Sequence, residues 1–133
     1  MRVAFLSNYF NHHQKPVSDA LMSGTAQYTF ISTQKLDVER KALGWTSDTD
    51  VCPADGTAEY AVLRQSDVVI VGSAPEALVQ WAARRSKLLF RYSERPLKDG
   101  NPPAKFLPRF LKWHYYNPPW RKTYMLCASA FTA

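Results

Sequence analysis

The sequence contains few of the residues that mark several large classes of protein. It has two cysteines in 133 residues, Cys52 and Cys127, and their spacing matches neither a CxxC pair nor a set of metal ligands. Cys127 lies in an apolar run, and we interpret it as a buried free thiol. No run of about 18 apolar residues occurs, so no transmembrane helix is predicted. A disulfide framework, a metal site and a membrane-spanning segment are therefore not expected.

The fingerprints of several common ligand sites are also missing. The first apolar run, Val3–Leu6, is followed by SNYFNHHQ and not by the GxGxxG of dinucleotide-binding domains. There is no Walker phosphate loop, no GxSxG nucleophile elbow and no acidic pair of a phospho-receiver domain. The apolar start is too short for a signal peptide, because polar residues from Asn8 onward interrupt it. We therefore expect no cofactor in this domain and a cytoplasmic location.

The composition fits one folded domain, residues 1–133, with an excess of positive charge. Hydrophobic residues make up 46% of the chain, which is enough for a packed core. Lys and Arg outnumber Asp and Glu by 17 to 11, a net charge of +6 that favours anionic partners such as a membrane surface, a sugar phosphate or a nucleic acid. No RNA- or DNA-binding motif accompanies the charge, so nucleic acid is not expected as a partner.

Apolar runs alternate with helical patterns along the chain. Val68–Val71 is apolar without alternation, as in a parallel strand covered on both faces. Five runs have the character of strands: Val3–Leu6, Gln27–Ser32, Val68–Val71, Leu88–Tyr92 and Tyr124–Ala128. Strands and helices at this spacing predict an α/β fold, a Rossmann-like three-layer α/β/α domain with a mostly parallel sheet of about five strands.

The helical patterns carry start and stop signals. Pro16 suits the first turn of a helix that Gly24 would end, with Val17, Ala20 and Leu21 on one buried face. Further helices are expected at about 57–65, after a long loop at 44–56, and at about 108–115. Ser73 and Glu76 have the spacing of a capping box, which would start a helix with Leu78, Trp81 and Ala82 on its buried stripe.

One loop combines amide and imidazole groups where open α/β sheets bind their ligands. If the strand order is the common 3-2-1-4-5, the crevice lies between the first strand and Val68–Val71. The loop after the first strand would line it with five candidate residues: Asn8, Asn11, His12, His13 and Gln14. Either histidine could act as a base near neutral pH. The alternative is that both are ordinary loop residues, one of them capping the next helix.

Two further groups of polar residues are expected at the same edge. Ser73 would place free backbone amides beside a phosphate or carboxylate, although capping alone explains it as well. Arg91, Glu94 and Arg95, at the end of the fourth strand, could clamp a sugar or phosphate. An ion pair of Glu94 with one of these arginines, which would only anchor the loop, is the competing interpretation.

The segment 105–122, KFLPRFLKWHYYNPPWRK, concentrates cations and aromatic rings. Packing of one helical face against the sheet is the simpler explanation. The alternative is contact with anionic lipid headgroups through Lys112, Trp113, Trp120 and Arg121, at the inner face of the membrane. The last apolar run ends without a covering helix, which predicts either a homodimer through uncovered sheet surface or a longer protein.

Taken together, MRVAFLSNYFNHHQKPVSDAL, DVVIVGSAPE, LLFRYSERPLK and YMLCASAFTA resemble the N-terminal part of bacterial group 1 (GT4-like) glycosyltransferases of the GT-B fold. The resemblance covers the whole chain, and NHHQKP with FRYSER is its most distinctive part. It implies an incomplete GT-B fold in which this domain binds a sugar or lipid-linked glycan acceptor in surface polysaccharide synthesis. His12, His13 and Glu94 would be the candidates for acceptor contact.

The resemblance also implies what this chain does not supply. The nucleotide-sugar donor would bind a C-terminal domain whose acidic and basic motifs are absent here. Because both halves orient the reactants, the 133 residues alone are not expected to transfer sugar. The competing hypothesis is a non-catalytic, flavodoxin-like module that docks an anionic partner or membrane through the segment 105–122.

Overall fold

The computed structural model describes residues 1–24, 27–44, 51–53, 56–85, 88–93, 107–108, 110–111, 114 and 123–127. Its strands are β1 (Arg2–Ser7), β2 (Gln27–Ser32), β3 (Val51–Pro53), β4 (Val68–Val71), β5 (Leu88–Ser93) and β6 (Thr123–Cys127). Its helices are α1 (Lys15–Ser23), α2 (Val38–Ala42), α3 (Ala58–Gln65) and α4 (Glu76–Arg85).

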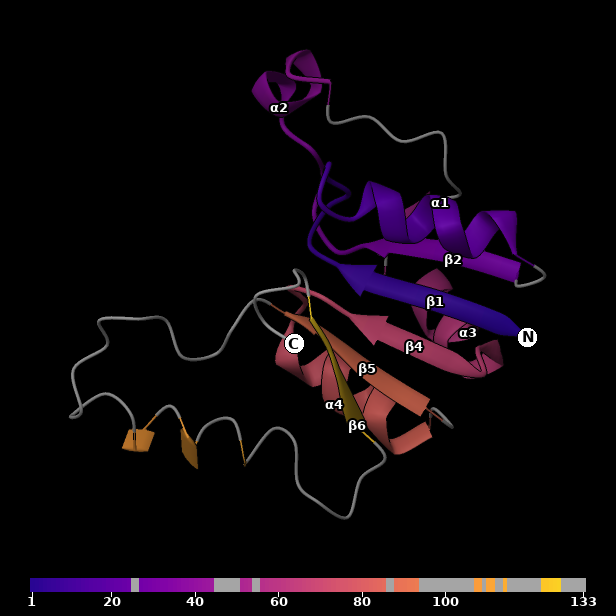
Figure 1. Cartoon of the computed structure of the whole chain (residues 1–133), viewed down its shortest axis with the longest axis vertical. Helices are drawn as coiled ribbons and strands as arrows, with labels where there is room; N and C mark the ends of the chain where they lie inside the picture. Colours follow the sequence, from indigo (N-terminus) through magenta and orange to yellow (C-terminus); the bar gives the residue numbers. More distant parts are fainter. Residues whose placement is uncertain are drawn as a thin grey trace.

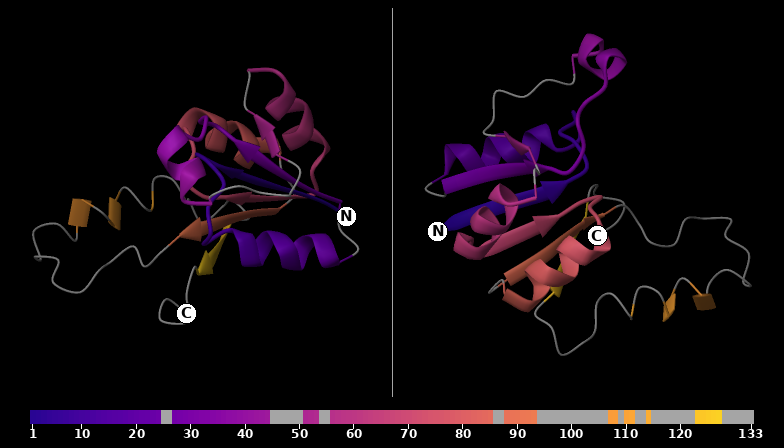
Figure 2. Two further views of the ribbon diagram at one scale, coloured as in Figure 1. Left: turned by 90° about the horizontal axis from the view of Figure 1, so that it is seen from above. Right: turned by 180° about the vertical axis from the view of Figure 1, so that it is seen from behind.

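All six strands form one sheet in the order β3-β2-β1-β4-β5-β6, and every pair is parallel. Helix α1 covers one face, while α3 and α4 cover the other (Figures 1 and 2). The three-layer α/β/α prediction is therefore confirmed, and the strand order reverses between β1 and β4 as expected. Short helix α2 projects beyond the end of the sheet near β1 and β2 (Figure 1).

Alternation along the central strands divides the core into two parts. Ala4 and Leu6 of β1 face α3 and α4, where Leu78, Val79 and Ala82 of α4 pack. Val3 and Phe5 face α1 and join a cluster rich in aromatic rings, which includes Phe10, Tyr28 and Phe30. Residues Val3–Ser7 are all buried, as β1 lies in the middle of the sheet. Burial on both faces explains why the central strands are continuous apolar runs.

Three expectations about the elements are wrong. Strand β3 lies within the stretch predicted as loop, because three residues containing a proline are too short to show strand periodicity. In α1, Ala20 is exposed, although it was expected on the buried face. Ser18 is fully buried instead, because its hydroxyl pairs with that of Tyr28 at 2.5 Å. The capping box does not form: α4 begins at Glu76, and the carbonyl of Pro75 accepts its first backbone hydrogen bonds.

Candidate functional site

The candidate site is built on the tip of β1, where strand register aligns three strand ends. Leu6 pairs with Val71 and Val71 pairs with Arg91, so β1, β4 and β5 end at the same edge. The backbone amide of Gly72 donates to the Leu6 carbonyl at 2.8 Å. A Cβ on Gly72 would lie 2.7 Å from Oγ of Ser7. The two strand ends therefore touch directly at the point where the strand order reverses.

A buried hydrogen-bond chain fixes the loop Asn8–Gln14 to this edge. Gln14, only 5% exposed, donates from Nε2 to Oγ of Ser7 at 3.1 Å and accepts from the Asn11 amide at 3.0 Å. Oγ of Ser7 donates in turn to Oδ1 of Asn8 at 3.2 Å. Gln14 thus joins both ends of the loop, and the side chain predicted to bind substrate has a structural task.

Four further contacts brace the loop. Phe10 is buried and packs edge-on against Phe30 of β2, with ring centroids 5.1 Å apart. The Asn8 carbonyl accepts hydrogen bonds from Oγ of Ser32 at 2.9 Å and from the Gln34 amide at 2.7 Å. The guanidinium of Arg40, a residue of α2, lies 4.5 Å from the centre of the Tyr9 ring. The loop is consequently held in one shape from β2, from the core and from α2.

The loop presents two imidazoles side by side. His12 and His13 are both exposed, and their ring centroids are 3.9 Å apart. Oδ1 of Asn11 accepts from the His13 amide at 2.9 Å, and this contact forms the turn that carries both rings. The predicted residues Asn8, Asn11, His12, His13 and Gln14 are therefore gathered in one loop.

Of the other predicted residues, the structure describes Ser73 and Arg91. Ser73 is exposed and follows the tip of β4, one residue beyond Gly72. Arg91 belongs to the opposite, α4-facing side of the sheet, where its Nη2 lies 3.7 Å from Oε1 of Glu76. Its side chain is only 19% exposed, so it anchors the start of α4 to β5. Glu94, Arg95, Lys112, Trp113, Trp120 and Arg121 lie outside the described residues.

Sequence reasoning placed the end of the fourth strand at this edge, but it did not select Tyr92, the residue that reaches the loop from β5. The Tyr92 hydroxyl donates to the carbonyl oxygen of His13 at 3.0 Å, across 79 positions of the sequence. Burial raises the pKa of Tyr92, so its hydroxyl stays a donor to a higher pH than that of an exposed tyrosine. No local pattern indicates such a contact, because it depends on the strand order alone. It confirms that the ends of β1 and β5 meet at one edge.

Two classes of site find no support among the described residues. No group of three or more His, Cys, Asp or Glu side chains there is placed to hold a metal ion. Within the same residues, no helix has the length and hydropathy needed to cross a bilayer.

Comparisons with known proteins leave the family open. No protein-family model matches the chain, and no curated protein matches it. The chain is similar to a solved protein of unknown function from Vibrio parahaemolyticus RIMD 2210633, with 15% sequence identity and a TM-score of 0.39. The match covers 68% of this chain and 80% of that protein. A similarity of this size assigns no activity.

Proposed function

We propose that this domain binds the acceptor of a sugar-transferring enzyme at the edge formed by β1 and β4. The observation that carries the proposal is the loop Asn8–Gln14, which is braced on several sides and exposes two imidazoles at the switch point of the sheet. Ligands of open α/β sheets bind at this point. A braced polar loop can orient a hydroxylated ligand with little loss of entropy on binding.

Sugar transfer requires that an acceptor hydroxyl be held in place and give up its proton. An imidazole can accept that proton near neutral pH, which is the task we assign to His12 or His13. The Oδ1 atoms of Asn8 and Asn11 are engaged within the loop, so their Nδ2 groups would donate to acceptor oxygens. The acceptor we propose is a free or lipid-linked glycan.

The nucleotide-sugar donor would bind a second Rossmann-like domain of the GT-B type. No residue of this chain is proposed to hold the nucleotide. Since transfer depends on orienting donor and acceptor together, this domain alone is expected to bind but not to transfer. The assignment to surface polysaccharide synthesis follows from the family resemblance and belongs to the same proposal.

Binding is tested by titrating the ¹⁵N-labelled chain with glucose, galactose, mannose and N-acetylglucosamine. We expect amide shifts confined to Asn8–Gln14 and to the neighbouring Gly72 and Ser73. A His12→Ala/His13→Ala double variant should lose them, whereas Arg64→Ala, on the exposed end of α3, should keep them. Shifts spread over the surface, or none with any of these sugars, would count against an acceptor site here.

Transfer is tested in the complete gene product that carries this domain. Incubation with radiolabelled nucleotide sugars and a lipid extract should label a lipid-linked product. Replacing His12 and His13 singly by Ala identifies the base: its loss should lower kcat by about 100-fold or more, the usual contribution of general base catalysis. Unchanged turnover in both variants would remove the imidazoles from the mechanism.

One observation favours the second candidate, a module that docks an anionic membrane. The apolar side chains of Leu107, Phe110 and Leu111 are exposed, and they lie in the strongly basic segment 105–122. Co-sedimentation with vesicles that contain phosphatidylglycerol measures binding of the protein to an anionic membrane. Binding that is lost with Phe110→Ala/Leu111→Ala and is absent for neutral vesicles would support docking. The absence of any binding at low salt would exclude it.

A further inference from the structure

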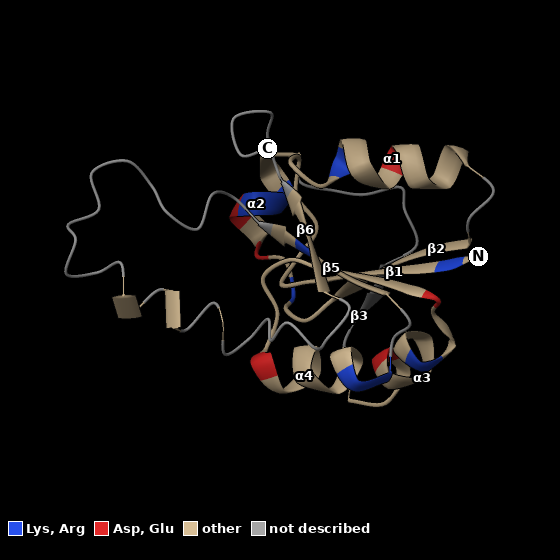
Figure 3. Cartoon of the chain, turned by 60° about the horizontal axis from the view of Figure 1, so that its bottom comes forward, with Lys and Arg blue, Asp and Glu red and all other residues tan. Residues whose placement is uncertain are grey.

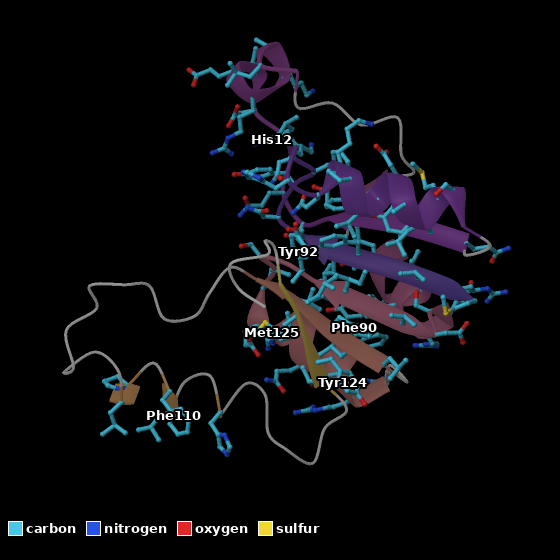
Figure 4. All side chains as sticks on the ribbon, in the orientation of Figure 1. His12, Phe90, Tyr92, Phe110, Tyr124 and Met125 are labelled. Atoms are coloured by element: carbon cyan, nitrogen blue, oxygen red, sulfur yellow. The ribbon has the colours of Figure 1, made fainter. Side chains whose placement is uncertain are left out.

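Tyr92 reaches the candidate site across the end of β4. Its ring packs edge-on against Phe5 of β1, with centroids 5.4 Å apart, although β4 lies between β5 and β1. Continuing the register beyond Val71 and Arg91 places Gly72 opposite Tyr92. Gly72 has no side chain, so the ring of Tyr92 can lie over the strand end and bring its hydroxyl to the loop. Figure 4 shows Tyr92 near the end of β1, below His12.

The hydroxyl of Tyr92 meets the loop at the peptide that carries the imidazole pair. The His13 carbonyl accepts from Tyr92 at 3.0 Å, while the His13 amide donates to Oδ1 of Asn11 at 2.9 Å. Residue His13 is thus held at its carbonyl by β5 and at its amide by its own loop. Fixing both polar groups of a residue restricts its backbone rotation, and hence the direction of the side chain it carries.

We infer that Tyr92 is a positioning residue, whose hydroxyl sets the orientation in which His12 and His13 face the acceptor. The part of this inference that concerns the acceptor rests on the function proposed above. The orientation itself is a property of the free protein. Tyr92 contacts no reacting atom in this account, and it acts through the backbone of His13 alone.

The test compares Tyr92→Phe with the matched control Tyr28→Phe. Tyr28 is buried and Tyr92 is partly buried, and both pack on the α1 face of the sheet, but the hydroxyl of Tyr28 pairs with Ser18 of α1 and not with the loop. Each variant loses one hydroxyl and keeps its aromatic ring, and thermal melting checks that both are folded. The readouts are the ring-proton resonances of His12 and His13 and the amide exchange of His13 and Gln14, without ligand.

We expect Tyr92→Phe to shift both sets of ring resonances and to speed the two amide exchanges by about fivefold, as the loss of one hydrogen bond implies. Tyr28→Phe should change neither. Unaltered ring resonances in a folded Tyr92→Phe variant would overturn the inference, whatever the protein binds.

Sugar titration of the same variants separates the inference from the proposed function. If the wild-type chain binds a saccharide at the loop, Tyr92→Phe should weaken that binding by about fivefold, and Tyr28→Phe should not. Equal affinities with altered ring resonances would show that the orientation does not matter to the acceptor. If no saccharide binds either protein, a changed ring signature still supports positioning while the acceptor proposal fails.

Discussion

At the scale of single residues, the contact between Gly72 and Ser7 sets how closely β1 and β4 end together. A Cβ at Gly72 would lie 2.7 Å from Oγ and 3.2 Å from Cβ of Ser7. Gly72→Ala is therefore expected to destabilise the protein by about 1–3 kcal/mol through overpacking. At Gly24 the same substitution meets atoms only at ordinary distances of 3.5 and 3.7 Å, and its cost should be below about 1 kcal/mol. Urea denaturation of both variants measures the difference, and equal midpoints would contradict it.

Gln14 gives a second prediction at this scale. Gln14→Ala leaves Oγ of buried Ser7 without its donor and frees the amide of Asn11. We expect a loss of about 1–3 kcal/mol in the free energy of unfolding, the cost of unsatisfied buried polar groups. Gln34→Ala is the control, because the Gln34 side chain is exposed and its recorded loop contact uses the backbone amide. Both are read from chemical denaturation, and a Gln14 variant as stable as the Gln34 variant would refute the structural task given to Gln14.

The hydrogen-bonding capacity of the loop Asn8–Gln14 was predictable from the sequence, but the partners of its side chains were not. A run containing Asn8, Asn11 and Gln14 beside two histidines indicates hydrogen-bonding capacity after a strand. Whether that capacity serves a ligand or the loop depends on distances, and here the amide side chains hold the loop. The brace from Tyr92 joins residues 79 positions apart, so no local window could contain it.

At the scale of elements, the long apolar runs were predicted to within a residue or two. Gln27–Ser32 and Val68–Val71 match their strands, since burial on one face leaves an alternating pattern and burial on both faces leaves a continuous apolar run. Strand β3 left none, because it has three residues among turn-formers. The capping box failed because the carboxylate of Glu76 turns to Nε2 of Gln80, at 2.7 Å, and to Arg91. The opposite charges at the two ends of α4 are visible in Figure 3.

The junction of α1 and β2 predicts how stability depends on alkaline pH. Tyr28 is 6% exposed, and burial raises its pKa from 10.0 to about 12. Because the folded state disfavours the phenolate, the associated stability is fully present below pH 10, the ordinary value, and is lost as the pH rises toward 12. The loss should be on the order of 2–3 kcal/mol for a shift of this size.

Tyr28→Phe is the variant that checks this dependence. At neutral pH the variant should be about 1 kcal/mol less stable, because it lacks the hydrogen bond to Ser18. At alkaline pH it should lack the loss of stability that comes from ionising Tyr28. Denaturation followed by circular dichroism at a series of pH values gives both curves. Parallel losses of stability in wild type and variant above pH 10 would show that Tyr28 does not control the alkaline transition.

At the scale of the whole molecule, the two faces of the sheet are covered unequally. In the described part of the chain, α3 and α4 lie on one face and α1 alone on the other, over β1 and β2 (Figure 3). The rings of Phe90 and Tyr124 pack at a tilt on the α1 side with centroids 5.5 Å apart, and Tyr124 is 51% exposed. A homodimer through uncovered sheet surface stays a prediction of the sequence.

The strand order also decides what the two cysteines can do. Cys52 lies in β3 and Cys127 in β6, the opposite edges of the sheet. Five interstrand steps of about 4.8 Å separate their backbones by about 24 Å, whereas a disulfide needs Cα atoms within about 7 Å. We expect iodoacetamide to modify both cysteines in unreduced, denatured protein, which mass spectrometry would detect as two added groups. Protein that takes up no added group and runs as a monomer without reductant would contain a disulfide between Cys52 and Cys127. Such a bond would require the two edges of the sheet to lie together and would contradict the strand order.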